Sequence, residues 1–278
     1  MLTSEMKAQF ERDGYLIVAG LFTEEEAARY RDHYMRLNEE RRVAGDTRFT
    51  GANPNDPLVR YPRMLQMHRW DETSLRWLLD RRIRDVLTGL LGAEPFAVQT
   101  MIYFKPPGAR GQALHQDNYY LRVRPGTCVA AWMALDETDE ANGCLNVVPG
   151  SQSWPILCTT QADTRESFTD ITVPLPAGTP VVPARMKPGD VLFFNGQLVH
   201  GSNANRTADR FRRSLIGHYI QGDSQQVAKY YHPVLRFDGS QVALEISPQG
   251  SQCGTWVTEG GKPVIEMVGY EKVEKATE

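Results

Sequence analysis

Two short segments organise the sequence: QALHQD at residues 112–117 and LVHGS at residues 198–202. If the first segment is extended, His115 and Asp117 project from the same face of a strand, because strand side chains alternate with a period of two. His200 can then supply a third ligand to the same metal ion. Two imidazoles and one carboxylate leave coordination positions open, as in non-haem Fe(II) oxygenases. A solvated surface histidine is the alternative interpretation of so short a motif.

The separation between the two segments bears on the fold. Roughly 80 residues lie between Asp117 and His200, and they return to one site only if the sheet folds back on itself, as in a jelly roll. Turn residues such as Asn142-Gly143 and Pro149-Gly150 separate short runs rich in β-branched and aromatic residues. The runs expected to be strands are Phe96–Phe104, Thr127–Leu135, Leu145–Val148, Asp170–Val173, Val181–Ala184, Asp190–Phe194 and Arg213–Ile220. They predict a mainly β fold, a double-stranded β-helix (jelly roll) with flanking helices.

Helical patterns precede these strands. We expect helices over Thr3–Asp13, from Thr23 to about Val43, and over Thr73–Leu91. Thr23 and Glu26 form the capping box of the second helix, and Gly92 ends the third. A strand is expected between Gly14 and Gly20, and an exposed loop over Ala44–Asn55.

The end of the chain is predicted to form a hairpin about Gly260-Gly261, followed by a charged tail from Glu271 to Glu278. At this length we expect one domain over residues 1–278. It would comprise a helical part over about 1–92, a jelly-roll core over about 93–221 and a C-terminal extension over 222–278.

Composition narrows the partners and the compartment. The net charge of −3 offers no basic surface for nucleic acid, and no run approaches the roughly 20 apolar residues of a membrane span. The first residues lack the apolar core of a signal peptide, so we expect a cytoplasmic protein. Four cysteines without C-x-x-C spacing are expected to be buried free thiols. Nothing in the sequence indicates the oligomeric state.

A cluster of arginines follows His200. A dicarboxylate co-substrate needs a cation for its far carboxylate, and a guanidinium provides two parallel hydrogen bonds. Four arginines lie within residues 206–213, so spacing alone selects none of them. If a strand begins at Arg212, alternation puts Arg212 and Ser214 on one face and Arg213 and Leu215 on the other. Surface charges are the alternative interpretation for at least two of the four.

Seven blocks of the sequence, spread in order over roughly Gly14 to Ile220, resemble the phytanoyl-CoA dioxygenase family. The blocks are Gln99–Gly108, His115–Asp117, Ala131–Asp136, Asn142–Leu145, Val148–Ser151, Lys187–Phe194 and His200–Ser202. The resemblance implies a jelly roll that binds Fe(II) through His115, Asp117 and His200, with 2-oxoglutarate and O₂ as co-substrates. It favours Arg212 ahead of Arg213 as the arginine that holds 2-oxoglutarate. Further co-substrate contacts are implied at Ser202, Trp132 and Gln99.

Two positions qualify the resemblance. Relatives commonly have histidine after Pro-Gly-Ser, whereas this chain has Gln152, which cannot titrate near neutral pH. Related halogenases replace the metal-binding carboxylate by a small residue, whereas Asp117 is intact here. The sequence therefore favours hydroxylation over halogenation.

The function expected from these observations is Fe(II)- and 2-oxoglutarate-dependent oxidation of a C–H bond in a small molecule, with release of succinate and CO₂. A catalytically silent jelly-roll binding module and a cupin-like metalloenzyme without 2-oxoglutarate are the alternatives. Loops should set the specificity, and the candidates are Ala44–Tyr61, Asn118–Gly126, Trp154–Thr169 and the stretch from Gln221 onward. Arg60, Arg63, Arg122 and Arg124 could bind the phosphates of a CoA thioester, but we favour a smaller metabolite.

Overall fold

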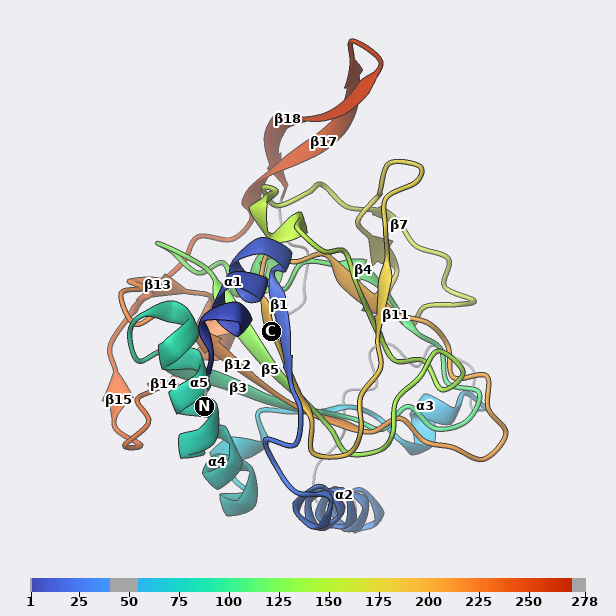
Figure 1. The fold of residues 1–278 in the computed structure, drawn as a ribbon, viewed down its shortest axis with the longest axis vertical. Helices are drawn as coiled ribbons and strands as arrows, with labels where there is room; N and C mark the ends of the chain where they lie inside the picture. Colours follow the sequence, from blue (N-terminus) through green and yellow to red (C-terminus); the bar gives the residue numbers. More distant parts are fainter. Residues whose placement is uncertain (1, 41–54, 272–278) are drawn as a thin grey trace.

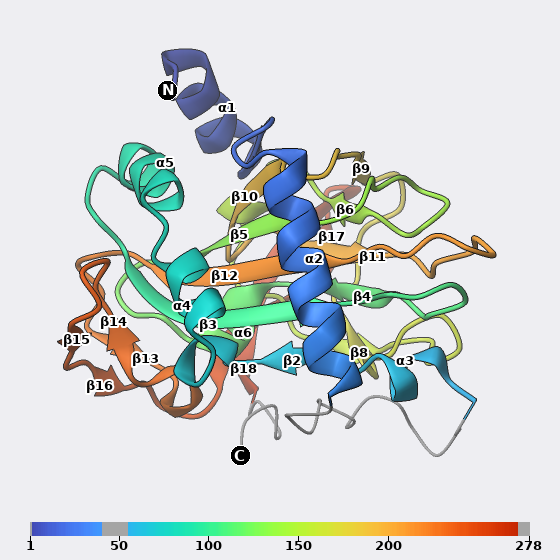
Figure 2. The ribbon, with the colours of Figure 1, turned by 90° about the horizontal axis from the view of Figure 1, so that it is seen from below.

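Two antiparallel sheets form the body of the molecule in the computed structural model, which describes residues 2–40 and 55–271. The large sheet has the order β1-β10-β5-β12-β3-β14-β15, with β2 also paired to β3, and the small sheet has the order β4-β11-β6-β9 (Figure 1 and Figure 2). The large sheet contains β1 (Tyr15–Val18), β2 (Met64–Leu65), β3 (Phe96–Tyr103), β5 (Cys128–Ala134), β10 (Val191–Asn195), β12 (Ser214–Ile220), β14 (Val234–Leu235) and β15 (Gln241–Val242). The small sheet contains β4 (Gln112–His115), β6 (Leu145–Val147), β9 (Val182–Ala184) and β11 (His200–Ser202). This arrangement confirms the predicted jelly roll.

Strict alternation divides the large sheet into two faces. On β5, Val129, Ala131 and Met133 join the hydrophobic core shared with the helices, whereas Ala130, Trp132 and Ala134 point toward the small sheet. The helices on the outer face are α1 (Ser4–Asp13), α2 (Glu24–Glu39), α4 (Glu72–Leu78) and α5 (Arg81–Leu91), and Figure 2 shows α2 running across the strands. The inner face is therefore left free to line the space between the sheets.

The helix predictions are confirmed in part. Thr23 accepts from the Glu26 amide and the Glu26 carboxylate accepts from the Thr23 amide, which is the predicted capping box. The expected single helix over Thr73–Leu91 is wrong, because Asp80 is extended and caps a new helix by accepting from the Arg82 amide at 2.8 Å. The loop expected over Ala44–Asn55 lies almost entirely outside the described residues, as does the end of the helix predicted to reach Val43.

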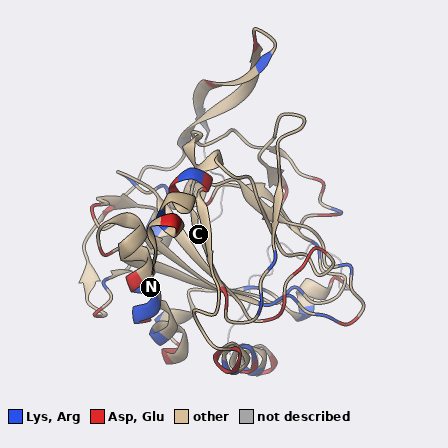
Figure 3. Ribbon diagram, in the orientation of Figure 1, with Lys and Arg blue, Asp and Glu red and all other residues tan. Residues whose placement is uncertain are grey.

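Short elements fill the connections. They are α3 (Pro57–Arg60), α6 (Asp117–Leu121), the 3₁₀ turns η1 (Met67–Arg69), η2 (Ser151–Ser153) and η3 (Lys229–Tyr231), and the paired strands β7 (Thr160–Gln161) with β8 (Ile171–Thr172) and β13 (Gln226–Val227) with β16 (Glu245–Ile246). Charged residues of both signs are interspersed along the outer helices and loops (Figure 3). Within the described residues, no helix combines the length and the apolar character needed to cross a bilayer.

The predicted C-terminal hairpin is confirmed and projects from the body (Figure 1). Strands β17 (Ser251–Glu259) and β18 (Lys262–Glu271) pair about Gly260-Gly261. The expectation of four free thiols is wrong for two of them, since Cys158 and Cys253 form a disulfide. The Cys158 amide donates to Gly254 O at 2.9 Å, so backbone pairing brings the two cysteines together. Cys128 and Cys144 are buried free thiols, as expected.

Candidate metal centre

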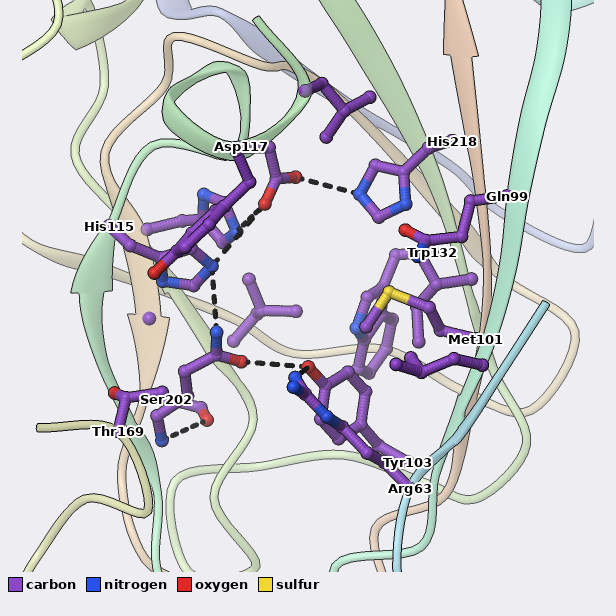
Figure 4. A pocket seen from close by; sticks show the side chains of 18 of the residues that line it. Arg63, Gln99, Met101, Tyr103, His115, Asp117, Trp132, Thr169, Ser202 and His218 are labelled. Carbon is purple, nitrogen blue, oxygen red and sulfur yellow. Dashed lines mark hydrogen bonds and ion pairs between the residues drawn. The ribbon is translucent and has the colours of Figure 1, made fainter. Parts of the chain in front are cut away.

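Three residues predicted as metal ligands meet between the sheets. His115 ends β4, His200 begins β11, and the two are direct partners in the small sheet. Asp117 Oδ1 lies 3.5 Å from His115 Nε2 and 3.7 Å from His200 Nε2. All three side chains are largely buried, and their ligand atoms lie within 4.8 Å of one another (Figure 4 shows His115 and Asp117).

The local backbone differs from the expected strand. Asp117 is the first residue of α6 and not part of β4. His115 and Asp117 still face the same way, because the intervening Gln116 is extended with φ −121° and ψ 125°. The buried side-chain amide of Gln116 holds this bend. It donates to Gln197 O at 2.8 Å and accepts from the backbone amide of Leu157 at 2.8 Å. Sequence reasoning did not identify this brace, because its partners lie far along the chain.

The protonation pattern of the two histidines fits a bound cation. His115 Nδ1 lies 2.9 Å from Ala113 O and His200 Nδ1 lies 3.0 Å from Leu198 O. A carbonyl can only accept, so each Nδ1 carries a hydrogen. His115 Nε2 accepts from the Gln112 side-chain amide at 3.1 Å, so it carries a lone pair where it faces the Asp117 carboxylate. Burial, with a smaller contribution from His115, lowers the pKa of His200 to about 4, so its ring is neutral at neutral pH. Lone pairs facing a carboxylate oxygen repel unless a cation lies between them, and two imidazoles with one carboxylate suit Fe(II).

His218 completes the cluster and was missed in the sequence. It lies on β12 and its Nε2 is 3.1 Å from Asp117 Oδ2 (Figure 4). Burial alone would raise the pKa of Asp117, but the nearby rings of His200 and His218 hold it well below its ordinary value. The signal was present, because His218 follows Arg212 at even spacing and so faces the same side of the strand.

A cavity of about 460 Å³ opens from these residues. Its walls come from both sheets and from three of the regions expected to set specificity. Tyr120 belongs to the 118–126 loop, Phe168 and Thr169 to the 154–169 loop, and Tyr230 and Tyr231 to the stretch after Gln221. Most of the fourth candidate region, Ala44–Tyr61, lies outside the described residues.

The arginines after His200 separate into different environments. Arg212 is 3% exposed and lines the cavity, with its Cζ 5.3 Å from the Trp132 ring centroid. Arg213 faces the other way and forms a bidentate ion pair with Asp136, with both N–O distances 2.8 Å. Arg210 pairs with Asp139 and Arg206 with Glu166.

The remaining predicted co-substrate residues also line the cavity. Trp132 and Gln99 come from the large sheet and Ser202 from the small sheet (Figure 4). Gln152, the departure from the family pattern, instead donates to Glu11 O at 2.9 Å at the end of α1. Of the four arginines considered for a CoA ester, Arg63 alone lines the cavity, where it donates to the Tyr103 hydroxyl at 3.1 Å.

Known proteins resemble the chain over most of its length. It is 27% identical over 242 residues to a probable phytanoyl-CoA dioxygenase of Caenorhabditis elegans. That alignment covers 80% of this chain and 77% of the relative. It is 26% identical over 224 residues to the ectoine dioxygenase of Stutzerimonas stutzeri, which covers 74% of this chain and 73% of that protein.

Solved structures share the fold. The apo form of EctD from S. alaskensis matches with a TM-score of 0.66 at 22% identity, over 88% of each chain. The epimerase SnoN from nogalamycin biosynthesis matches with a TM-score of 0.63 at 24% identity, over 79% of this chain and 81% of SnoN. The sequence profile described as phytanoyl-CoA dioxygenase (PhyH) matches residues 10–214. The chain therefore belongs to the phytanoyl-CoA dioxygenase family.

Proposed function

We propose that the chain oxidises a C–H bond of a small metabolite at an Fe(II) ion held by His115, Asp117 and His200. The enzyme class follows from the family: the chain is an Fe(II)- and 2-oxoglutarate-dependent dioxygenase, which consumes O₂ and releases succinate and CO₂. The observation that carries the assignment of these residues is the buried cluster in which two imidazole lone pairs face one carboxylate oxygen.

The residues around this cluster hold and shield it. The chemistry that Fe(II) supplies when bound is the activation of O₂ coupled to decarboxylation of 2-oxoglutarate. Ala113 O and Leu198 O fix the orientation of the two imidazoles, and His218 fixes the carboxylate of Asp117. The Phe194 ring lies 4.4 Å from that of His200 between centroids and keeps water from that side.

The co-substrate belongs at the other end of the cavity. Arg212 is the cation proposed to bind the far carboxylate of 2-oxoglutarate, since it is buried, lines the cavity and has no carboxylate partner among the described residues. Ser202, Trp132 and Gln99 are proposed to complete this subsite. Asp117 keeps its carboxylate, so hydroxylation stays favoured over halogenation.

The alternatives are not favoured. Relatives are named dioxygenases, which speaks against a catalytically silent binding module. A cupin-like metalloenzyme without 2-oxoglutarate would have no use for a buried, unpaired guanidinium beside the metal cluster.

The substrate is proposed to be a small metabolite and not a CoA thioester. One relative is named for ectoine, and the SnoN structure was solved with nogalamycin RO, so small molecules are substrates or ligands of similar proteins. In this chain Arg60, Arg122 and Arg124 do not line the cavity. A CoA phosphate would therefore meet one lining arginine, Arg63, and not a basic groove.

Succinate release tests the proposal. The wild-type protein would be supplied with Fe(II), 2-oxoglutarate and a panel of metabolites in air. We expect one metabolite class to raise succinate above the uncoupled background, and omission of Fe(II) to abolish the signal. Stoichiometric metal binding without any 2-oxoglutarate turnover would support the binding module instead.

We also propose that residues 1–278 work as one domain in the cytoplasm, without nucleic acid or membrane as a partner. Shared hydrophobic packing between the helices and the large sheet supports the single domain. The disulfide between Cys158 and Cys253 gives the location a direct test. Rapid alkylation of cells should trap both thiols reduced in the cytoplasm, whereas an intact bond would point to an oxidising compartment.

A further inference from the structure

Lys105 is a buried cation that the proposed chemistry does not use. It lies just after β3, is 3% exposed, and does not line the cavity. Its ammonium donates to Ser202 Oγ at 2.8 Å, Gly143 O at 3.2 Å and Asn203 O at 2.5 Å. All three acceptors are neutral oxygens, so these hydrogen bonds leave the charge of the ammonium unbalanced. Burial, and after it the charge of Arg212, lowers the pKa of Lys105 well below its ordinary value, so an anion bound nearby would favour the charged form.

A second unbalanced cation lies beside it. Arg212 Nε donates to Gly143 O at 3.0 Å, the same carbonyl that Lys105 contacts. Neither side chain forms an ion pair with a carboxylate within residues 2–40 and 55–271. The nearby Cys144 does not provide the missing charge, since burial raises the pKa of its thiol to about 11. Buried charges without a partner destabilise a folded protein, so this pair is expected to attract an anion.

Gly143 provides the carbonyl that both Lys105 and Arg212 contact. Its φ of +76° lies in the left-handed region, and a Cβ there would come within 2.5 Å of Asn203 O and 3.1 Å of Lys105 Nζ. Glycine therefore lets one carbonyl accept from both cations. The central strands carry few charged residues (Figure 3), and Arg63 is the other arginine that lines the cavity.

Lys105 also determines what the Ser202 hydroxyl can do. Ser202 Oγ accepts from Lys105 Nζ at 2.8 Å and from the backbone amide of Gln112 at 3.3 Å. A hydroxyl has two acceptor lone pairs and one hydrogen, so both lone pairs are occupied and the hydrogen is left to donate. Ser202 lines the cavity, as does Arg212. The hydroxyl is thus set as a donor on the wall where an acceptor anion would lie.

We propose that Lys105 is a positioning residue for the distal carboxylate of 2-oxoglutarate. It acts without touching the co-substrate: it turns the Ser202 hydroxyl into a donor and adds a second positive charge beside Arg212, both of which a carboxylate complements. The inference rests on the proposed function, because it requires 2-oxoglutarate to bind in this cavity. The competing explanation is that Lys105 only braces the backbone at Gly143 and Asn203.

A pair of ligands separates these explanations. 2-Oxopentanoate is 2-oxoglutarate with the distal carboxylate replaced by a methyl group, so it keeps the metal-chelating end and loses the anion. Binding of both would be measured by calorimetry with Mn(II) in place of Fe(II) under anaerobic conditions, so that no turnover is needed. The quantity of interest is the ratio of the dissociation constant for 2-oxopentanoate to that for 2-oxoglutarate.

We expect the wild-type protein to prefer 2-oxoglutarate strongly and the Lys105→Met variant to show that ratio reduced by about tenfold or more. Lys187→Met, at an exposed lysine in another turn of the barrel, should leave the ratio unchanged. Lys105→Gln keeps a neutral donor and should fall between the wild type and Lys105→Met. If Lys105→Met does not fold, the single variants Lys105→Gln and Ser202→Ala serve as the test instead.

Equal weakening of both ligands would overturn the inference, because a brace affects the whole cavity and not one carboxylate. An unchanged ratio in Lys105→Gln and Ser202→Ala would overturn it as well. If the wild-type protein binds neither ligand, the proposed function itself fails. That outcome is distinct, since it is visible before any variant is made.

Discussion

The two sheets contribute to the candidate site in different ways. The small sheet and the adjoining α6 supply the three proposed metal ligands from short, irregular segments, with a register shift between His200 and Ser202. The large sheet supplies Gln99, Trp132, Arg212 and His218 from or beside longer strands, and the pairing of β12 with β3 shifts register once, between His218 and Tyr219. The metal end therefore depends on specific side-chain braces such as Gln116, whereas the co-substrate end depends on strand register.

The largest effect is expected on the small-sheet side. Replacing His115, Asp117 or His200 by Ala should abolish Fe(II)-dependent succinate formation, because each removes one of three proposed ligands from a preformed site. Circular dichroism should show that the fold persists. His33→Ala, which removes a histidine from the helical side, is the control and should stay active. An active His200→Ala enzyme would break the metal assignment.

The next effect tests the register of the large sheet. Arg212→Lys keeps the charge but loses the bidentate geometry, so apparent affinity for 2-oxoglutarate should fall by roughly 2 kcal/mol or more. Arg213→Lys and Arg210→Lys should change it little, since those arginines pair with Asp136 and Asp139. The measurement is the 2-oxoglutarate dependence of succinate formation in the three variants. Damage confined to Arg213→Lys would mean that the inward face has been misassigned.

A third prediction links the two sheets. His218 reaches from β12 to the Asp117 carboxylate, so His218→Leu should weaken metal binding by about 10- to 100-fold, as is typical when a partner of a metal ligand is lost. Competition between the protein and a chelator for Mn(II) measures this without turnover. Ile216→Val on the same face of β12 is the matched control. Unchanged metal affinity in His218→Leu would show that the two sheets act independently.

The smallest effect concerns the outer face of the large sheet. Burial lowers the pKa of His68 to about 4 from the usual 6.5, so the unfolded chain takes up this proton first as pH falls. The stability due to neutral His68 is therefore fully present above pH 6.5 and is lost as pH falls toward 4. Between pH 6.5 and 5.5 the wild type should lose about 1 kcal/mol more unfolding free energy than His68→Asn. Urea titrations at both pH values check this, and parallel losses would contradict it.

The features that the sequence could predict are those set by residues close together in the chain. Regular alternation was enough to put Arg212 and Arg213 on opposite faces, and local capping chemistry was enough to start α2 at Thr23. Both depend on residues close together in the chain. The break before α5 was missed because Asp80 stops a helix without glycine or proline, and its capping role depends on an extended backbone that the sequence leaves open.

Contacts between distant segments could not be predicted. Gln116 bonds to Leu157 and Gln197, and His218 bonds to Asp117, across 41, 81 and 101 positions respectively. The disulfide joins cysteines 95 positions apart, and their spacing carries no motif. Lys105 reads as an ordinary lysine in a Lys-Pro-Pro turn, and only its three buried acceptors distinguish it.

The link between Cys158 and Cys253 has a consequence for exchanging parts between relatives. The family profile ends at residue 214, before the projecting hairpin, yet the hairpin is covalently joined to the loop that carries Phe168 and Thr169 into the cavity. Trp256 strengthens the connection by donating to Pro174 O at 3.0 Å. The loop and the hairpin should therefore be exchanged together. A chimaera that takes the 154–173 loop without β17 and β18 would carry an unpaired Cys158 and would lose the hairpin contacts that support the loop.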